Sequence, residues 1–372
     1  MIIKNGTIFT EDGFKEGSIG VAEGTFVNAD RAGGEVLDAT GKYVLPGLID
    51  VHGHGNSGYD FSTCDENGLR MMAAYLAENG ITSFAPASMT VSYESLKTAY
   101  GNALALHKNR KAKEAKLVGI NMEGPFFSYG KRGAQNPEYL KLPDFEVFKD
   151  LYASCEGLIK IADVAPELEG AMDFIKKASE LCTVSVAHTE AGYDLALEAF
   201  DAGASHVTHL FNGMNGIHHR NPGVPLAALE NEKVLAELIC DGIHIHPSVI
   251  RMVFKLFAGR VVMISDALSC CGMEDGEYDL GELKVTLRGL TATLDDGTLA
   301  GSVTNLFGMM KNVISYGIPA EEAIRSCTIN PAKQLKMEQK IGSIKEGKCA
   351  DFLICDKEWK LEAVYIEGQK VR

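Results

Sequence analysis

The sequence predicts an α/β protein: a (β/α)8, TIM-like barrel with a small β-sandwich domain formed by both chain termini. Short apolar runs recur eight times in the middle of the chain, and most are separated by stretches with helical periodicity. The two ends instead contain short mixed segments punctuated by Gly and Asp. We therefore assign residues 48–334 to the barrel and residues 1–47 plus 335–372 to the small domain.

The terminal segments predict a small antiparallel sheet with tight turns. Residues 1–3 and 24–27 have strand-like composition and are followed or preceded by Gly-containing turns. Residues 349–354 and 362–366 return to the same style at the other end of the chain. Because both ends share this character and the middle does not, we expect them to pair in one domain beside the barrel.

Eight strand-like runs define the predicted barrel. They lie near residues 48–51, 81–85, 117–121, 158–163, 183–187, 204–208, 236–240 and 261–264. Helical periodicity is clear over residues 69–77, 172–178 and 249–257. A doubly wound open sheet is the alternative architecture. No Gly-x-Gly-x-x-Gly motif follows the first run, so a dinucleotide site is not expected in either case.

Metal-competent side chains follow six of the eight runs. They are His52 and His54 after the first run, Glu123 after the third, His188 after the fifth, His209 after the sixth, His244 after the seventh and Asp266 after the eighth. One such residue at a strand end is usually structural, but six at the same end of one barrel are difficult to explain as coincidence. Active sites of these barrels lie at the C-terminal ends of the strands. The pattern therefore predicts a metal-dependent active site.

The residue types indicate metal-assisted hydrolysis, with an amide as the expected substrate. One divalent ion, or two ions with a shared ligand, can be held by His52, His54, Glu123, His188 and His209. A bound metal lowers the pKa of its water from about 15.7 toward about 7, which provides a hydroxide nucleophile. Asp266 is the expected general acid/base, and His244 the group that polarises the substrate carbonyl. No Gly-x-Ser-x-Gly motif is present, which disfavours a serine nucleophile.

A basic, Gly-containing segment follows His209. It spans residues 212–223 and includes His219 and Arg220. Arginine pairs bidentately with phosphate or carboxylate, and a Gly-rich loop exposes backbone N–H groups to an anion. The segment therefore predicts an anion subsite beside the metal site, although a solvated turn would have the same composition. A second basic segment, residues 131–135, is either part of the same rim or a charged surface loop.

The composition excludes several classes of function. The net charge of −14 disfavours binding to nucleic acid or to anionic membranes. No run approaches the roughly 18 apolar residues of a membrane span, and the first residues are not a signal peptide. Nine cysteines without a Cys-x-x-Cys pair predict reduced thiols in a cytoplasmic protein, with the adjacent Cys270 and Cys271 expected to be structural.

The motifs resemble those of the amidohydrolase superfamily and, within it, of the deacetylases that act on N-acetylated amino-sugar phosphates. The resemblance covers essentially the whole chain, and residues 203–223 are its most specific part. The matching segments are His52-Gly53-His54 and residues 122–126, 133–134, 187–191, 203–214, 218–223, 239–244, 265–267, 299–302, 330–332, 342–344 and 350–351.

This resemblance implies the fold predicted above and the removal of acetate from N-acetyl-D-glucosamine 6-phosphate to give D-glucosamine 6-phosphate. It implies Glu123, His188 and His209 as metal ligands, and the presence of both His52 and His54 favours a second ion. Zinc is the expected metal, with iron, manganese or cobalt as alternatives. It implies Asp266 as acid/base and a homodimer. The implied substrate contacts are Ala134, Asn212, Gly213, His219, Arg220, His244 and Leu299.

Three alternatives remain open at this point. The substrate could be the galactosamine epimer, because the orientation of one hydroxyl group is not encoded in a motif. Another amidohydrolase activity, on N-acyl amino acids or dihydropyrimidines, would not require the phosphate contact of Arg220. A binding protein that has kept the fold and lost turnover would not require the intact acid/base Asp266.

Overall fold

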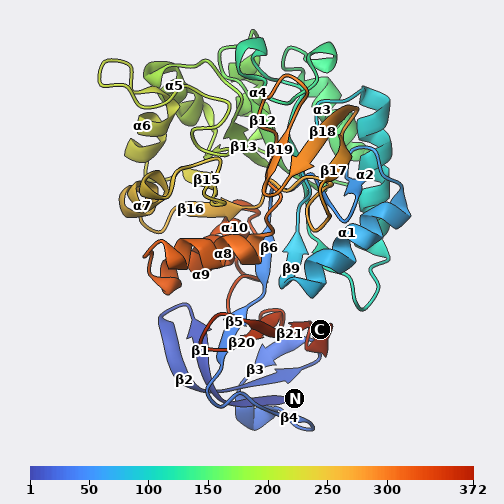
Figure 1. The fold of residues 1–372 in the computed structure, drawn as a ribbon, viewed down its shortest axis with the longest axis vertical. Helices are drawn as coiled ribbons and strands as arrows, with labels where there is room; N and C mark the ends of the chain where they lie inside the picture. Colours follow the sequence, from blue (N-terminus) through green and yellow to red (C-terminus); the bar gives the residue numbers. More distant parts are fainter.

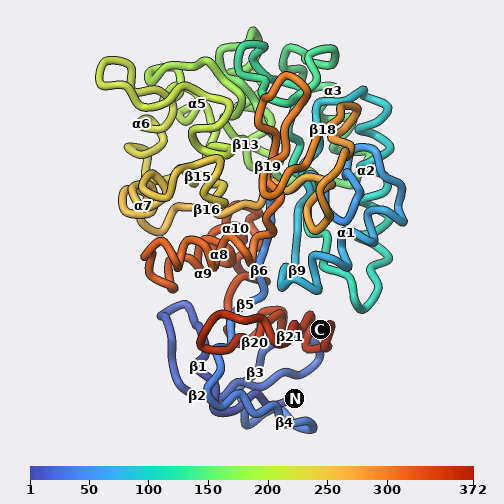
Figure 2. Tube along the Cα trace, in the orientation of Figure 1, coloured from blue at the N-terminus to red at the C-terminus, as the bar shows by residue number.

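The computed structural model describes all 372 residues and has a mixed α/β fold with two parts. In Figure 1 a sheet built from the first and last strands lies below a larger part that contains all ten α-helices. Figure 2 shows the blue N-terminal and red C-terminal ends of the chain together in the lower part. None of the helices has the length and apolar character needed to cross a membrane.

Eight parallel strands form the centre of the larger part. They are β6 (Leu48–Asp50), β9 (Ile81–Phe84), β11 (Ile120–Met122), β12 (Ile159–Val164), β13 (Thr183–Val186), β14 (His206–Val207), β15 (Leu235–Ile239) and β16 (Val261–Ile264). β6 and β9 pair in one sheet with β10 (Lys116–Leu117), and β11 to β16 pair in sequence order in another. Each of the eight overlaps one of the predicted runs.

Backbone contacts join the edges of these two sheets. On one side Ala87 and Asn121 form a parallel bridge, which links the segment after β9 to β11. On the other side the amide of Asp266 donates to the carbonyl of His52 over 2.7 Å. The C-terminal ends of the first and last strands of the set therefore lie next to each other.

Helices connect and cover the strands. They are α1 (Glu66–Glu78), α2 (Tyr93–Lys108), α3 (Phe145–Ser154), α4 (Ala171–Ala178), α5 (Tyr193–Ala202), α6 (Gly223–Glu230), α7 (Pro247–Leu256), α8 (Leu306–Ser315), α9 (Ala320–Cys327) and α10 (Ile329–Gln334), with short 3-10 turns at Ala29–Arg31, Tyr129–Lys131 and Pro137–Tyr139. α1 begins where the Asp65 side chain accepts from the Gly68 amide, and it buries Leu69, Met72 and Leu76 on one face. The three stretches predicted as helical coincide with α1, α4 and α7.

The terminal strands form one eight-stranded sheet. They are β1 (Ile2–Thr10), β2 (Gly13–Ala22), β3 (Thr25–Val27), β4 (Val36–Asp38), β5 (Tyr43–Pro46), β20 (Phe352–Cys355), β21 (Leu361–Ile366) and β22 (Gln369–Lys370). β5 pairs with β1 on one side and with β20 on the other, which joins the two ends of the chain. The strands from both ends of the chain are therefore hydrogen-bonded in one continuous sheet. A buried cluster that includes Phe26, Val44 and Phe352 gives it a core of its own.

Two small antiparallel elements were not predicted. β7 (Gly55–Asn56) pairs with β8 (Tyr59–Asp60), and β17 (Gly276–Leu280), β18 (Leu283–Arg288) and β19 (Thr291–Thr293) form a three-stranded sheet. The three-stranded sheet contains alternating polar and apolar residues, a pattern typical of strands with one exposed face. It follows β16, and the segment after it reaches the functional site described below (Figure 1).

Candidate active site

The residues predicted at the strand ends converge on one buried cluster. Glu123 follows β11, and its Oε1 lies 3.1 Å from His188 Nε2 and 3.0 Å from His209 Nε2. The two imidazole Nε2 atoms are themselves 3.1 Å apart. Three potential ligand atoms from three different strands therefore face a common point, as a metal site requires.

The remaining two histidines, His52 and His54, also contact Glu123. His54 Nε2 is 3.3 Å from Glu123 Oε2 and 3.2 Å from Asp266 Oδ1. His52 Nε2 is 3.4 Å from Glu123 Oε1 and 3.7 Å from Asp266 Oδ1. The sets His52–His54–Asp266 and His52–Glu123–His209 each bring three ligand atoms close enough for one ion. His52 belongs to both sets. Glu123 lies within 3.4 Å of one pair of histidines, His188 and His209, and of the other pair, His52 and His54.

Outward hydrogen bonds fix how the four histidines present their rings. Each Nδ1 faces a protein oxygen: Glu237 Oε2 at 2.9 Å from His52, the Ala87 carbonyl at 3.1 Å from His54, the Lys131 carbonyl at 2.8 Å from His188, and the Asn212 carbonyl at 3.0 Å from His209. A neutral imidazole that donates from Nδ1 keeps its lone pair on Nε2. His52 Nε2 is fully buried and has no hydrogen-bond partner. This donor set fits a divalent metal.

Three of these residues occupy a sharp turn of the backbone at the end of their strands. His188, His209 and Asp266 have positive φ angles of 43°, 27° and 46°. Such angles cost non-glycine residues about 1–3 kcal/mol each and are typical of functional sites. The turn aims each side chain across the ends of the strands, where the cluster forms.

The site holds its carboxylates in the ionised form. Burial by itself raises the pKa of Glu123, but His52 and the hydrogen bonds of His188 and His209 lower it well below its usual range. Burial likewise raises the pKa of Asp266, and the hydrogen bond and charge of nearby histidines more than reverse this. In His52 burial lowers the pKa, while the charges of Glu237 and Glu123 raise it well above the usual value. The cluster therefore favours bound positive charge.

A pocket of about 150 Å³ opens onto the cluster. Five of the predicted substrate contacts line it: Ala134, Asn212, Gly213, His244 and Leu299. Arg220 and His219 are exposed and do not line it; Arg220 Nη1 instead lies 2.7 Å from His219 Nε2. Both belong to the loop that follows Gly213, so a change in this loop is needed to bring them to the pocket.

His244 lies at the edge of the pocket between two acceptors. Its Nδ1 is 2.6 Å from Asp241 Oδ2, and its Nε2 is 2.7 Å from the Ala300 carbonyl. Burial lowers its pKa, but the hydrogen bond and charge of Asp241 raise it above the usual value overall. Both ring nitrogens therefore face acceptors, and Nε2 faces Ala300, which itself lines the pocket.

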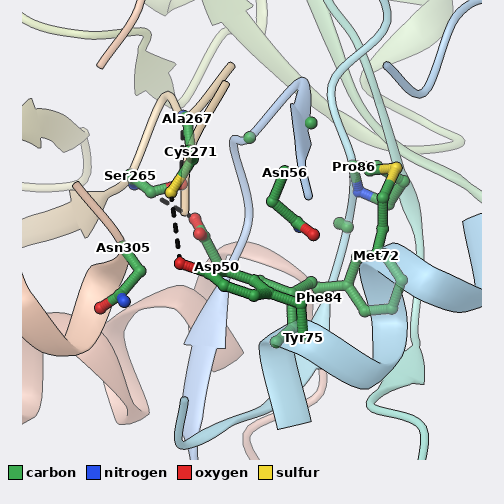
Figure 3. Close-up of a pocket in the computed structure, with 14 residues that line it drawn as sticks. Asp50, Asn56, Met72, Tyr75, Phe84, Pro86, Ser265, Ala267, Cys271 and Asn305 are labelled. Atoms are coloured by element: carbon green, nitrogen blue, oxygen red, sulfur yellow. Dashed lines mark hydrogen bonds between the residues drawn. The ribbon is translucent and has the colours of Figure 1, made fainter. Parts of the chain in front are cut away.

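A smaller cavity of about 20 Å³ lies at the end of β6 (Figure 3). Asp50 lines it and accepts from the backbone amides of Ser265 and His52 at 3.3 and 3.4 Å, which ties the ends of β6 and β16 together. Cys271 also lines it, with its Sγ 3.7 Å from Tyr75 Oη. Burial raises the pKa of Cys271 to about 12, so this thiol stays protonated and inert.

Two buried residues contact the cluster but were not predicted from the sequence as site residues. Gln135 donates from Nε2 to Glu123 Oε2 over 2.7 Å, and Glu237 holds His52 as described above. The signal for Glu237 was a single acidic residue inside an otherwise apolar run, residues 235–239. Gln135 gave no comparable signal, because a glutamine after a loop is ordinarily a surface residue.

The sequence model of the amidohydrolase family matches residues 43–371. The chain therefore belongs to the amidohydrolase family. Among curated relatives, an N-acetylglucosamine-6-phosphate deacetylase of Bacillus subtilis (strain 168) is 36% identical over 384 residues, covering 99% of this chain and 96% of that protein. An N-acetylgalactosamine-6-phosphate deacetylase of Escherichia coli O157:H7 is 29% identical and covers 99% and 98%.

Solved structures give the same result. The N-acetyl-D-glucosamine-6-phosphate deacetylase of Mycobacterium smegmatis, a mutant in complex with N-acetyl-D-glucosamine-6-phosphate, has a TM-score of 0.92 at 28% identity, covering 100% of this chain and 99% of that one. The N-acetylglucosamine-6-phosphate deacetylase of Thermotoga maritima has a TM-score of 0.90 at 27% identity, covering 100% and 99%. The resemblance inferred from the sequence motifs is confirmed.

Proposed function

We propose that this protein hydrolyses the acetamide of N-acetyl-D-glucosamine 6-phosphate to D-glucosamine 6-phosphate and acetate, in amino-sugar catabolism. The observation that carries the proposal is the set of four histidines whose Nδ1 atoms are bonded outward while their Nε2 atoms surround two ionised carboxylates. The full-length similarity to deacetylases of amino-sugar phosphates supports the choice of substrate.

The proposed metal ligands are His52, His54, Glu123, His188 and His209. This set has room for one ion at His188, His209 and Glu123 and for a second at His52 and His54, with Glu123 between them. Nitrogen and oxygen donors of this kind suit zinc, with iron, manganese or cobalt as alternatives. A bound divalent cation supplies a Lewis acid that lowers the pKa of water to about 7.

Asp266 is the proposed general acid/base. Its Oδ1 is 3.2 Å from His54 Nε2, and its carboxylate faces the pocket in the ionised form, ready to accept a proton. It then returns the proton to the amine as that group leaves. The N–H group of His244 on the pocket side donates to the substrate carbonyl in place of Ala300.

The pocket wall and the loop after Gly213 complete the proposed substrate site. Ala134 and Leu299 contact the sugar, while the backbone at Asn212 and Gly213, together with His219 and Arg220, binds the phosphate. Binding requires the exposed loop with Arg220 to move toward the pocket. Loop ordering on ligand binding is common when the ligand supplies the missing charge.

The finer architecture is also part of the proposal. The eight parallel strands close into a (β/α)8 barrel over residues 48–334, and residues 1–47 plus 335–372 form the small β-sandwich domain. The contacts that join the two sheet edges at Asn121 and at His52 support closure. We propose a cytoplasmic homodimer.

The galactosamine epimer is the second candidate substrate, because the Escherichia coli O157:H7 relative named for that sugar covers nearly the whole chain. Acetate and free-amine release should be measured with metal-analysed protein on both 6-phosphates and on unphosphorylated N-acetylglucosamine. We expect a strong preference for N-acetylglucosamine 6-phosphate. Faster turnover of the galactosamine epimer would identify that epimer as the substrate. Equal rates for N-acetylglucosamine with and without the 6-phosphate would exclude the anion subsite.

A further inference from the structure

Glu237 lies in the middle of β15 and is fully buried. Its Oε2 accepts from His52 Nδ1 at 2.9 Å and from the backbone amide of His209 at 3.3 Å. Its Oε1 accepts from the side-chain amide of Gln334 at 3.1 Å. One carboxylate oxygen therefore touches both groups of the histidine cluster: the ring of His52 on one side and the backbone of His209 on the other.

We propose that Glu237 is a positioning residue that fixes the tautomer of His52 and keeps it in register with His209, so that His52 Nε2 is a metal ligand. This inference rests on the metal site of the proposed function. The surroundings of His52 Nε2 support the proposal, because that atom is fully buried and has no hydrogen-bond partner in the protein.

The charge of Glu237 is central to this role. Its carboxylate oxygens face three donors, namely His52 Nδ1, the His209 amide and the Gln334 side-chain amide, which is the pattern of an anion that only accepts. The pocket at the cluster has no lysine or arginine in its lining. An anion behind the ring makes the imidazole a stronger ligand, and such partners change metal affinity by about 10–100-fold.

A second carboxyl group in the same interior provides the contrast. Asp163 in β12 is as buried as Glu237, but it contacts Thr208 Oγ1 at 3.0 Å and no histidine of the cluster. Burial and the charges of Glu237 and Glu123 raise its pKa well above the usual value. Asp163→Asn therefore changes a buried carboxyl group of the same interior that does not touch the cluster, which makes it a matched control for Glu237→Gln.

The Glu237→Gln variant keeps the shape and reverses a hydrogen bond. Glutamine offers one oxygen, whereas His52 Nδ1, the His209 amide and Gln334 all donate to Glu237. If the oxygen stays with Gln334, the new NH₂ group faces both His52 Nδ1 and the His209 amide, which is itself a donor. His52 must then accept on Nδ1 and carry its proton on Nε2, which prevents that atom from binding a metal.

The test measures Zn²⁺ binding and the state of the His52 ring, with no need for substrate. Wild type, Glu237→Gln, Glu237→Asp and Asp163→Asn would be loaded with Zn²⁺ and dialysed against a graded zinc buffer before metal analysis. Nitrogen-15 NMR of the histidine rings, with His52→Asn to assign the signal, reports the tautomer. We expect Glu237→Gln to bind the ion at His52 about 10–100-fold more weakly, with the Nε2 proton present. Asp163→Asn should stay within about twofold of wild type.

The conservative variant separates charge from shape. Glu237→Asp keeps the anion on a shorter side chain, and we expect it to retain more zinc than the isosteric glutamine. The inference is overturned if Glu237→Gln binds zinc with the stoichiometry and the His52 tautomer of the wild type. It is also overturned if the zinc bound to the wild-type protein is not coordinated by His52. Failure of deacetylation with these zinc results intact rejects only the proposed function. A wild type that binds no zinc rejects both.

Discussion

The side-chain amide of Gln135 donates to Glu123 Oε2 over 2.7 Å, while its own oxygen accepts from the backbone amide of Thr90 at 2.7 Å. Gln135 therefore anchors the carboxylate that stands between the two groups of histidines. With Oε2 held in this way, Oε1 is left to His188 and His209. The position of Glu123 depends on a residue from a loop and not only on its own strand.

Replacing Gln135 by leucine should weaken metal binding at Glu123, His188 and His209. The change leaves Glu123 Oε2 and the Thr90 amide without their partner, which costs about 1–3 kcal/mol for a buried polar group. We expect metal affinity to fall by about 10–100-fold. Zinc titration with a chromophoric chelator measures it, and the exposed Gln339→Leu serves as control. Unchanged affinity would show that Glu123 is held without Gln135.

Asp266→Asn should slow turnover strongly and leave metal binding at Glu123, His188 and His209 largely intact. The carboxamide cannot accept the proton that Asp266 is proposed to take, so we expect kcat to fall by at least about 100-fold. Acetate release and metal analysis of the same preparation check both halves of the statement. Substantial activity in the Asp266→Asn variant would show that another group is the acid/base, and His244 would be the next candidate.

Removal of the metal should lower both activity and thermal stability. Glu123 and Asp266 are buried at the centre of the cluster, so loss of positive charge there destabilises the folded state. An ion present at 100 times its dissociation constant stabilises the fold by about 2.7 kcal/mol. Calorimetry of chelator-treated protein, with stepwise return of zinc, iron, manganese or cobalt, measures the loss and its recovery. Equal melting temperatures with and without metal would contradict the proposed site.

Arg220→Ala should raise KM for the phosphorylated substrate far more than it lowers kcat. Arg220 lies in an exposed loop away from the metal cluster, so its loss removes phosphate binding without touching the reacting atoms. A charge-assisted contact of this kind contributes about 1.5–3 kcal/mol, which corresponds to roughly 10–150-fold in KM. Steady-state kinetics with and without the 6-phosphate provides the control. Equal effects on both substrates would exclude a phosphate contact.

The chain should lose stability as the pH falls from about 6.5 to about 4, in part through His206. Burial lowers the pKa of His206 from 6.5 to about 4 in the folded protein. Because the folded pKa lies below the unfolded one, the unfolded chain takes up the proton first, and acid favours unfolding. A shift of this size corresponds to on the order of 3 kcal/mol.

Chemical denaturation of metal-free protein across this pH range measures the effect, and His206→Gln should flatten the dependence. The imidazole has no carboxylate within hydrogen-bond distance; Glu237 Oε1 is 3.9 Å from its Nε2. Its Nδ1 faces the hydroxyl of Ser185 at 2.9 Å instead. An equal pH slope in both proteins would assign the acid sensitivity to other groups.

The amino-acid sequence was sufficient to predict the eight strands, the strand ends that carry the proposed ligands and the class of reaction. Apolar runs are local patterns, and a His or Asp directly after such a run is visible without any tertiary contact. The pairing of both termini was also foreseen, since the two ends share a composition that the middle lacks. The three-stranded sheet β17–β19 was missed, although its alternation of polar and apolar residues was present in the sequence.

How these residues meet depends on contacts between segments that are far apart in the sequence. Glu237 and His52 are 185 positions apart along the chain, and Gln135 and Thr90 are 45 positions apart. Nothing local to either member of a pair indicates the other. The position of Arg220 also could not be derived from the sequence: the motif predicts a contact with the substrate, whereas the side chain is exposed in the structure. Local patterns set which segments become strands, because burial and backbone geometry act residue by residue. The contacts that orient ligands and tune their charge form across strands, where sequence distance carries no information.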